Sequence, residues 1–240
     1  MPWFALATYR KNGKLLPAIA VGDALYDLRS AARTAHVALK AQWLEGGTEA
    51  IVRDWRSSAA ALKKAGAAIC KLAGAGKLRP IGKLEHAAVT PYRPARIFCA
   101  AANYIEHANE MTTVLASKAE AKPYMFLKLQ NTVIGPRDTV RMPPETKMLD
   151  WEVELAAVIG RRARRVPLAK ALDYVAGYSV VNDVSARDLN KRKDYPFAFD
   201  WFQGKCHDTF APFGPCIVPA WLIRDPQALR MKLSVNGETM

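Results

Sequence analysis

Two glutamates separated by a single residue are the first feature of this sequence that suggests chemistry. Glu152 and Glu154 stand in the segment Asp150-Trp-Glu-Val-Glu-Leu-Ala-Ala-Val-Ile-Gly160. Because successive side chains of a β-strand alternate, both carboxylates would point to one face, about 7 Å apart along the chain. Carboxylate oxygens are the ligands that hard divalent cations such as Mg²⁺ prefer. A strand with one solvated face is the alternative, but the apolar run from Leu155 to Ile159 suggests that the strand enters the interior.

A third carboxylate follows another apolar segment. Asp183 comes at the end of Tyr178-Ser-Val-Val-Asn-Asp183, where it could cap the next segment or form an Asx-turn. With Glu152 and Glu154 it would instead complete an acidic triad. Such a triad leaves coordination positions for water and substrate, as Mg²⁺ sites commonly do.

A histidine and two lysines could also take part in chemistry. His107 and Glu110 are three residues apart, so on a helix they share a face and the carboxylate can orient or charge the imidazole. That is the geometry of a general base, and a surface histidine with a chance neighbour is the alternative. Lys205 follows Gly204, where backbone can approach a ligand, although a solvated loop lysine would look the same. Lys128 is a cation inside an apolar strand and needs an anionic partner.

The elements that must position these residues are rich in β-structure. Strands are predicted at 97–101, 124–129, 139–142, 151–159, 177–184, 216–218 and 231–235, and helices at 104–118 and 168–174. Strand and helix do not alternate regularly along this part of the chain. The pattern therefore favours an α+β fold with a mixed, rolled sheet over a doubly wound sheet.

The residues before this region are predicted to form a smaller α+β domain. A three-stranded meander at 3–9, 15–21 and 24–28 precedes helices at 30–44 and 48–72, the second with Thr48 as its N-cap. A basic, proline-containing linker follows and places a boundary near residue 93. We therefore expect an N-terminal domain of residues 1–92 and a catalytic domain of residues 93–240.

The composition fits a compact cytoplasmic protein. The 240 residues suffice for a substantial core, no apolar stretch approaches the roughly 20 residues of a membrane span, and the start of the chain lacks a secretory signal. The four cysteines include no Cys-x-x-Cys pair, which suits reduced thiols rather than a disulfide framework or a zinc site.

The formal charge of +13 keeps open an alternative of another class, a non-catalytic anion-binding or nucleic-acid-binding protein. The densest basic runs, at 161–165 and 191–193, contain no interleaved aromatic residues of the kind that stack on bases. We therefore expect a solvated basic rim, with no nucleic acid and no membrane as partner.

Several segments, in their order along the chain, resemble the fumarylacetoacetate hydrolase family over roughly residues 96–240. The matching segments are Asn103-Tyr104 with His107 and Glu110, Pro-x-x-Phe-x-Lys ending at Lys128, Glu152-Val-Glu154, Ala171-Leu-Asp-Tyr-Val-Ala-Gly-Tyr178, Asn182-Asp-Val-Ser-Ala-Arg-Asp188, Gly204-Lys205 and Phe213-Gly-Pro215. The resemblance is particularly to bacterial members with a short N-terminal domain. It implies a mixed β-sandwich or β-roll catalytic domain and a homodimer.

The resemblance also implies roles for the candidate residues. The ligands of a Mg²⁺ (or Mn²⁺) ion would be Glu152, Glu154 and Asp183. The catalytic residues would be His107 with Glu110, as a base on a lid-like helix, and Lys205, which would stabilise developing negative charge. The expected substrate-binding residues are Tyr104, Lys128, Arg187 and Asn190.

On these grounds we predict a Mg²⁺-dependent hydrolase that cleaves a carbon–carbon bond in a small 2-oxo acid through a metal-bound enolate. Acylpyruvates and fumarylpyruvate are examples of such a substrate. Decarboxylation or isomerisation of oxaloacetate or of 2-hydroxymuconate-type diacids on the same site is the alternative.

The sequence also departs from the family in three places. Ala100-Ala-Ala102 stands where the family usually has a glycine, and Asn190 stands where several relatives have glutamine, so substrate specificity is expected to differ. The family's Gly-Thr-Pro and following glycine-rich segment has no counterpart before Met240. Because Asn236-Gly237 is a hairpin signal that begins a returning strand, we expect the natural polypeptide to continue past Met240.

Overall fold

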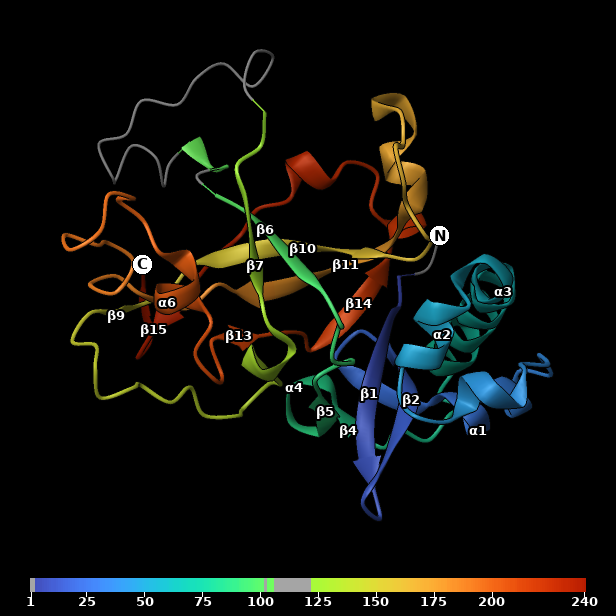
Figure 1. The fold of residues 1–240 in the computed structure, drawn as a ribbon. Helices are drawn as coiled ribbons and strands as arrows, with labels where there is room; N and C mark the ends of the chain where they lie inside the picture. Colours follow the sequence, from blue (N-terminus) through green and yellow to red (C-terminus); the bar gives the residue numbers. More distant parts are fainter. Residues whose placement is uncertain (1–2, 102, 106–121) are drawn as a thin grey trace.

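The protein has the α+β architecture expected from its sequence (Figure 1). The structure is a computed structural model that describes residues 3–101, 103–105 and 122–240. Most of the helix expected at 104–118, with His107 and Glu110, lies outside these residues. Within the described part of the chain, none of the helices combines the length and the apolar character that crossing a membrane requires.

An eight-stranded antiparallel sheet forms the centre of the molecule. Its strands follow the order β10-β11-β14-β1-β2-β3-β4, and β5 pairs with β1. Their bounds are β1 Ala5–Lys11, β2 Lys14–Val21, β3 Ala24–Asp27, β4 Gly82–Lys83, β5 Ala88–Val89, β10 Val153–Ile159, β11 Val175–Asn182 and β14 Cys216–Pro219. The meander expected near the N-terminus is confirmed. The sheet contains strands from both sides of residue 93, and the division into two domains stays a prediction.

Four two-stranded sheets surround this central sheet. They pair β6 Ile97–Ala100 with β7 Met125–Lys128, β8 Val133–Ile134 with β13 Ala211–Pro212, β9 Leu149–Asp150 with β12 Ser185–Ala186, and β15 Ser234–Val235 with β16 Glu238–Thr239. The β8–β13 pair is parallel, so the strands as a set are mixed.

The strand expected at 139–142 is wrong. The Arg141 backbone N–H donates to Thr209 Oγ1 at 2.8 Å instead of joining a ladder, and Pro143-Pro144 follows, which cannot donate to a neighbouring strand. The hairpin signal at Asn236-Gly237 is confirmed, since both residues adopt positive φ angles of 53° and 90° between β15 and β16. That conformation matches a type I′ turn.

Within the described residues, most of the helical structure precedes residue 93. The α-helices described there are α1 Leu28–Thr34, α2 Glu49–Arg53, α3 Trp55–Gly74, α4 Leu84–Ala87 and α6 Trp201–Lys205. Short 3₁₀ helices lie at Ala41–Leu44, Gln130–Thr132, Leu168–Tyr174, Ala220–Leu222 and Pro226–Ala228. The helix expected at 168–174 is therefore a 3₁₀ helix.

The two longer helices predicted near the N-terminus are both interrupted. The one expected at 30–44 ends at Thr34, because His36 adopts a left-handed φ of 53° and the Val37 N–H turns back to the Ala32 carbonyl at 2.9 Å. This pattern is a Schellman-type helix end.

The second predicted helix divides into α2 and α3 at Asp54, whose φ of −104° and ψ of 33° leave the helical region. Thr48 occupies the N-cap position of α2, as expected, but its side chain makes no capping hydrogen bond. Its Oγ1 instead donates to the Pro91 carbonyl at 2.7 Å.

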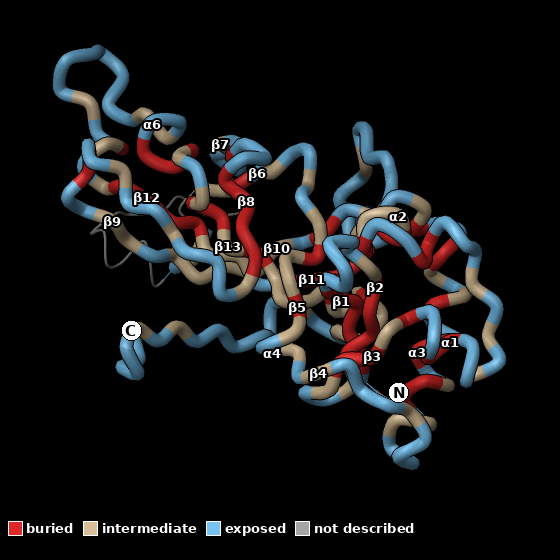
Figure 2. Tube along the Cα trace, turned by 90° about the horizontal axis from the view of Figure 1, so that it is seen from below, coloured by how far each residue is buried: buried red, intermediate tan, exposed pale blue. Residues whose placement is uncertain are grey.

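The core occupies both faces of the first strands. Alternation along β1 places Leu6 in the cluster shared with Leu62 and Ile69 of α3, while Ala5 and Ala7 belong to a second cluster on the opposite face. Figure 2 shows buried residues along β1 and β2, with further buried stretches at β8 and α3, and the C-terminal segment exposed. The buried first strands thus lie in the same sheet as β10 and β11.

Candidate metal centre and active site

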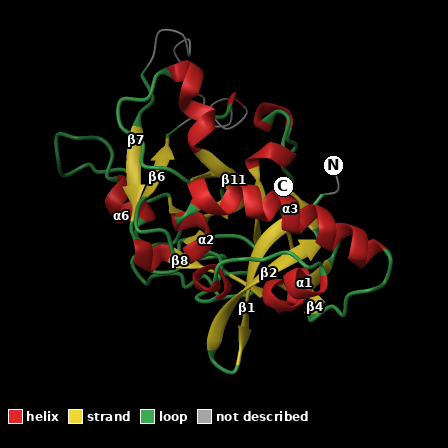
Figure 3. Ribbon diagram, turned by 90° about the vertical axis from the view of Figure 1, so that its right-hand side faces the viewer, coloured by secondary structure: helices red, strands yellow, loops and turns green. Residues whose placement is uncertain are grey.

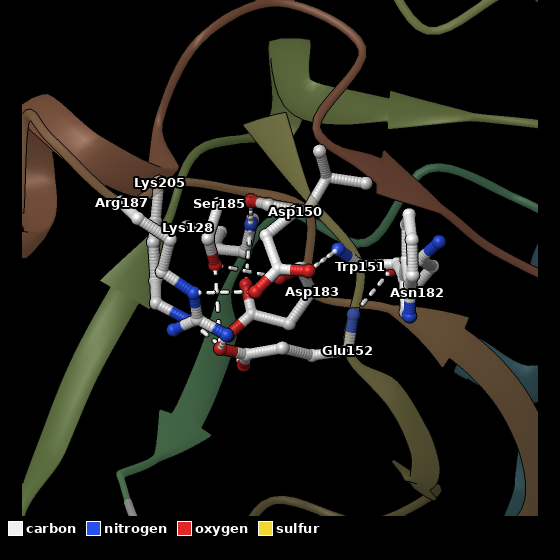
Figure 4. A network of polar contacts seen from close by, with 10 residues as sticks. Lys128, Asp150, Trp151, Glu152, Asn182, Asp183, Ser185, Arg187 and Lys205 are labelled. Atoms are coloured by element: carbon white, nitrogen blue, oxygen red, sulfur yellow. Dashed lines mark hydrogen bonds and ion pairs between the residues drawn. The ribbon is translucent and has the colours of Figure 1, made fainter. Parts of the chain in front are cut away.

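Three acidic side chains converge where β10 and β11 meet, and Figure 4 shows two of them, Glu152 and Asp183, with their polar contacts. Glu154 lies in β10, Glu152 stands just before that strand, and Asp183 follows β11. The register pairs Val153 with Asn182, and the Asp183 N–H donates to the Glu152 carbonyl at 2.9 Å. One carboxylate oxygen from each of the three acids lies within 4.8 Å of the others. The two glutamates and the aspartate therefore face a common point, as their spacing predicts.

Two buried lysines donate to these carboxylates. The Lys205 ammonium, at the end of α6, lies 2.9 Å from Glu152 Oε2 and 2.7 Å from Asp183 Oδ2. Lys128 of β7 donates to Asp183 Oδ1 and, at 3.1 Å, to the Val184 carbonyl. Lys128 is only 3% exposed and Lys205 only 5% exposed. The anionic partner predicted for Lys128 is thereby confirmed, and it is Asp183.

An arginine holds the outer side of the cluster. Arg187 Nε lies 2.7 Å from Asp150 Oδ2, and its Nη2 lies 2.7 Å from Glu152 Oε1. The backbone N–H of Glu152 donates to Asn182 Oδ1 at 2.9 Å, and Ser185 Oγ donates to the Asp183 carbonyl at 2.9 Å. Glu152 and Asp183 are thus held in place by several neighbouring side chains.

Sequence reasoning assigned no role to Asp150, Asn182 or Ser185. The sequence did contain a signal for Asp150. It precedes Glu152 by two residues, so in an extended strand its side chain would point to the same face as those of the two glutamates. Asn182 and Ser185 flank Asp183, but their contacts depend on the register between β10 and β11 and between β9 and β12.

The carboxylates of the cluster differ in how well nearby cations balance their charge. Burial and the neighbouring Asp183 and Glu152 raise the pKa of Glu154 from its ordinary value of 4.5 to about 7. Burial alone would raise the pKa of Asp183, but the charges of Lys128 and Lys205 lower it overall. Burial would likewise lower the pKa of Lys205, but Asp183 and Glu152 raise it. Asp183 and Lys205 are therefore charged, while Glu154 holds its proton up to about neutral pH.

A divalent cation fits this set of side chains. The described cluster contains four carboxylates (Asp150, Glu152, Glu154 and Asp183) and three cationic groups (Lys128, Arg187 and Lys205), which sum to −1 when all are ionised. Glu154 has no ion pair with these cations, and a positive ion beside it would offset the repulsion that raises its pKa. The ligands available are all oxygens, which suits Mg²⁺ or Mn²⁺.

The remaining predicted residues lie at the border of the cluster or outside the described residues. The Tyr104 hydroxyl accepts from the Leu155 N–H of β10 at 3.2 Å. Asn190 is buried, and its Oδ1 has no hydrogen-bond partner within the described part of the chain. A Cβ added at Gly204 would lie 1.8 Å from Asn190 Oδ1, so the close approach of Asn190 to α6 requires glycine beside Lys205. The placement of His107 and Glu110 is outside the described residues.

Comparison with known proteins connects this site to a family. Residues 96–240 match the family described as fumarylacetoacetate (FAA) hydrolase C-terminal. A mitochondrial oxaloacetate tautomerase from Rattus norvegicus, Fahd2a, is 38% identical over 146 residues, which cover 61% of this chain and 44% of the relative. The chain thus spans less than half of that relative.

Several solved structures match nearly the whole chain, and two of them are informative about the site. A fumarylacetoacetate hydrolase from the psychrophilic Exiguobacterium antarcticum gives a TM-score of 0.67 at 26% identity, covering 98% of this chain and 73% of that one. A maleylpyruvate hydrolase from Sphingobium sp. SYK-6, solved with manganese(II) and pyruvate, gives 0.66 at 27% identity, covering 98% and 74%. Both likenesses include the strands that carry the acidic cluster, since they extend over almost all of the residues.

Proposed function

Because this chain belongs to the fumarylacetoacetate hydrolase family, we propose that it is a divalent-metal-dependent enzyme that cleaves a carbon–carbon bond in a small 2-oxo acid by hydrolysis. The observation that carries the proposal is the convergence of Glu152, Glu154 and Asp183 within 4.8 Å. The similar maleylpyruvate hydrolase was solved with manganese(II) and with pyruvate, itself a 2-oxo acid, which supports the same class of ligand here.

In this proposal Glu152, Glu154 and Asp183 would hold Mg²⁺ or Mn²⁺. When bound, the cation supplies positive charge that polarises the oxo group of the substrate and stabilises negative charge beside it. With a divalent ion present, the net charge of −1 around the cluster becomes +1. That balance favours an anionic substrate such as a carboxylate.

The cationic side chains have separate tasks. Lys205, desolvated and charged, stabilises negative charge on a substrate oxygen, because a buried ammonium interacts strongly in a low-dielectric site. Lys128 and Arg187 hold Asp183 and Glu152 in position. His107, oriented by Glu110, is the proposed base that takes a proton from the attacking water. That water adds to the distal carbonyl, the carbon–carbon bond breaks, and the 2-oxo acid fragment leaves with the electron pair and takes up a proton.

Keto–enol tautomerisation is a second candidate for the same site. The 38% identity to the oxaloacetate tautomerase favours it. It would need the same polarised oxo group and a proton moved between carbon and oxygen, with no attacking water. Decarboxylation of oxaloacetate or isomerisation of a hydroxymuconate-type diacid belongs to the same group of reactions.

The test is turnover of an acylpyruvate, fumarylpyruvate and oxaloacetate, each with Mg²⁺, Mn²⁺ or EDTA. Hydrolysis is measured as loss of the absorbance of the dioxo substrate with release of two acids. Tautomerisation is measured as conversion of the enol to the keto form without cleavage.

Glu154→Gln is expected to lower turnover at least about 100-fold, because one of three ligands is lost. The matched control is Glu145→Gln, at an exposed carboxylate outside the cluster. Undiminished turnover in Glu154→Gln or in EDTA would refute the metal-dependent mechanism.

The homodimer implied by the family resemblance is also a proposal. Phe98, Met125 and Leu127 lie on one face of the β6–β7 pair and are exposed, and an exposed apolar surface supports a protein contact there. Light scattering on the purified chain tests it, and a monomeric mass at micromolar concentration would contradict it.

A further inference from the structure

Four aromatic rings cluster beside the lysines of the candidate site. The Trp201 ring centroid lies 4.7 Å from that of Tyr124, 5.3 Å from that of Phe126 and 5.8 Å from that of Phe199. These four residues, here called the aromatic cluster, come from β7, the segment just before it, α6 and the loop preceding that helix. Sequence reasoning gave none of them a role.

The same two elements carry both the lysines and the aromatic rings. Trp201 and Lys205 are the first and last residues of α6, four apart, so they lie on one face of the helix. Phe126 and Lys128 are two apart on β7, so they lie on one face of the strand. Figure 3 shows α6 beside β7. The aromatic cluster is therefore next to the acidic cluster.

One contact joins the two clusters directly. The Lys205 ammonium lies 5.2 Å from the centroid of the Phe126 ring, within the range of a cation–π interaction. On the other side, the same ammonium bonds Glu152 and Asp183. A substrate head bound at the carboxylates and Lys205 would therefore lie close to the Phe126 ring.

The aromatic cluster also presents open ring surface. Tyr124 is 66% exposed and Phe199 is 57% exposed, so their rings are not covered by the described part of the chain. Aromatic rings bind planar apolar groups in offset or edge-to-face arrangements. A planar group arriving from the acidic cluster would bury this surface.

We propose that the aromatic cluster is the subsite for the distal part of the substrate, and that it selects 2-oxo acids with a planar unsaturated or aromatic group over those with a short tail. The proposal rests on the proposed function, because it takes the 2-oxo acid head to lie at the acidic cluster. Trp201 is the central specificity-determining residue, since its ring contacts the other three.

The test compares two substrates that share a head and differ only in the tail, acetylpyruvate and benzoylpyruvate. The wild-type protein is expected to show the higher kcat/KM for benzoylpyruvate. Trp201→Ala should lower kcat/KM for benzoylpyruvate about tenfold more than for acetylpyruvate, the size typical of one aromatic contact. Trp201→Phe keeps a ring and should restore most of the preference.

Phe202→Ala is the matched control on the same helix. Phe202 is 66% exposed and follows Trp201 directly, so its side chain leaves the helix in another direction. The preference for benzoylpyruvate should be unchanged in this variant. Melting temperatures of all variants, measured in parallel, report any loss of packing between α6 and β7.

Three outcomes would overturn the proposal. They are equal losses for both substrates in Trp201→Ala, a wild-type preference for acetylpyruvate, and a Phe202→Ala variant that loses the preference as strongly as Trp201→Ala. If neither substrate is turned over, the proposed hydrolysis is wrong. The subsite is then tested separately, by the binding of benzoylpyruvate. Benzoylpyruvate should quench tryptophan fluorescence in the wild type with Mg²⁺ and quench it less in Trp201→Phe, whereas equal quenching overturns the subsite.

Discussion

Two buried polar clusters join distant segments of this chain, and they differ in how completely their groups are paired. In the first, here called the hydroxyl node, Thr8 Oγ1 and Thr48 Oγ1 both donate to the Pro91 carbonyl, at 2.6 Å and 2.7 Å. The Thr48 N–H donates to Thr8 Oγ1 at 3.0 Å. The second is the acidic cluster around Glu152, Glu154 and Asp183.

The hydroxyl node has no net charge, and each of these hydroxyl groups has a partner inside the protein. The acidic cluster has a net charge of −1 when all its groups are ionised, and it contains a carboxyl group, Glu154, whose pKa is raised to about 7. A neutral, paired cluster stabilises the fold, whereas unbalanced buried charge lowers stability and is retained where a ligand uses it. We infer that the acidic cluster serves function and the hydroxyl node serves stability. Four experiments test this difference, from the largest expected effect to the smallest.

Removing the charge of Asp183 should have the largest effect. In Asp183→Asn both Lys128 and Lys205 lose their shared negative charge, and the Lys128 ammonium keeps the Val184 carbonyl and a neutral amide oxygen as acceptors. Breaking a buried ion pair costs about 3–5 kcal/mol, which denaturant unfolding measures. Asp173→Asn, which breaks an exposed pair with Lys170, is the control and should change stability by less than about 1 kcal/mol. Equal effects in the two variants would contradict the distinction.

Divalent metal should stabilise the wild-type protein. At a Mg²⁺ or Mn²⁺ concentration of about 100 Kd the gain is about 2.7 kcal/mol, seen as a rise in Tm. The gain should be larger at pH 8 than at pH 6, because the Glu154 carboxyl group, with a pKa of about 7, must release its proton to bind metal. Asp183→Asn should show little rise, and a rise of the same size at both pH values would argue against Glu154 as a ligand.

Glu154→Gln should stabilise the metal-free protein at alkaline pH. A carboxyl group whose folded pKa of about 7 exceeds its ordinary 4.5 binds extra protons in the folded state between these values, so the wild type loses stability as pH rises through this window. The glutamine variant lacks this loss. After allowance for partial exposure, the variant should be more stable by about 2 kcal/mol at pH 8 and equal near pH 4.5. Unfolding in urea with EDTA at both pH values measures the difference.

Thr48→Val should have the smallest effect. The substitution preserves shape and removes one of two hydroxyl donors to the Pro91 carbonyl, while Thr8 still donates to it. The expected loss is about 1 kcal/mol at every pH, and turnover should be unchanged because the residue lies in the hydroxyl node. A pH-dependent loss, or a change in metal affinity, would show that the two clusters are coupled.

The sequence was sufficient for features that follow from local chemistry. The spacing of Glu152 and Glu154 placed both carboxylates together, since the alternation of a strand leaves no other arrangement. The position of Lys128 in an apolar strand required an anion, because a buried unpaired cation is too costly. The positive φ of Asn236 and Gly237 followed from the preference of these residues for a tight hairpin.

Features that depend on tertiary contacts could not be predicted from the sequence. The helix expected through residue 44 ends early because His36 adopts a left-handed conformation, which helix propensity alone does not predict. Thr48 is a good capping residue that bonds instead to a carbonyl 43 residues away. The aromatic cluster around Trp201 forms between a strand and a helix 75 residues apart or more, a separation that no periodicity reveals.

The absence of a side chain at Gly204 has a practical consequence. With Asn190 Oδ1 only 1.8 Å from where a Cβ would be, one methyl group at residue 204 obliges either the Asn190 side chain or α6 to move. Gly204→Ala therefore reports how tightly this contact holds Lys205. If α6 moves, the ammonium is displaced while the three carboxylates stay in place, and substrate binding can then be measured without the full charge arrangement.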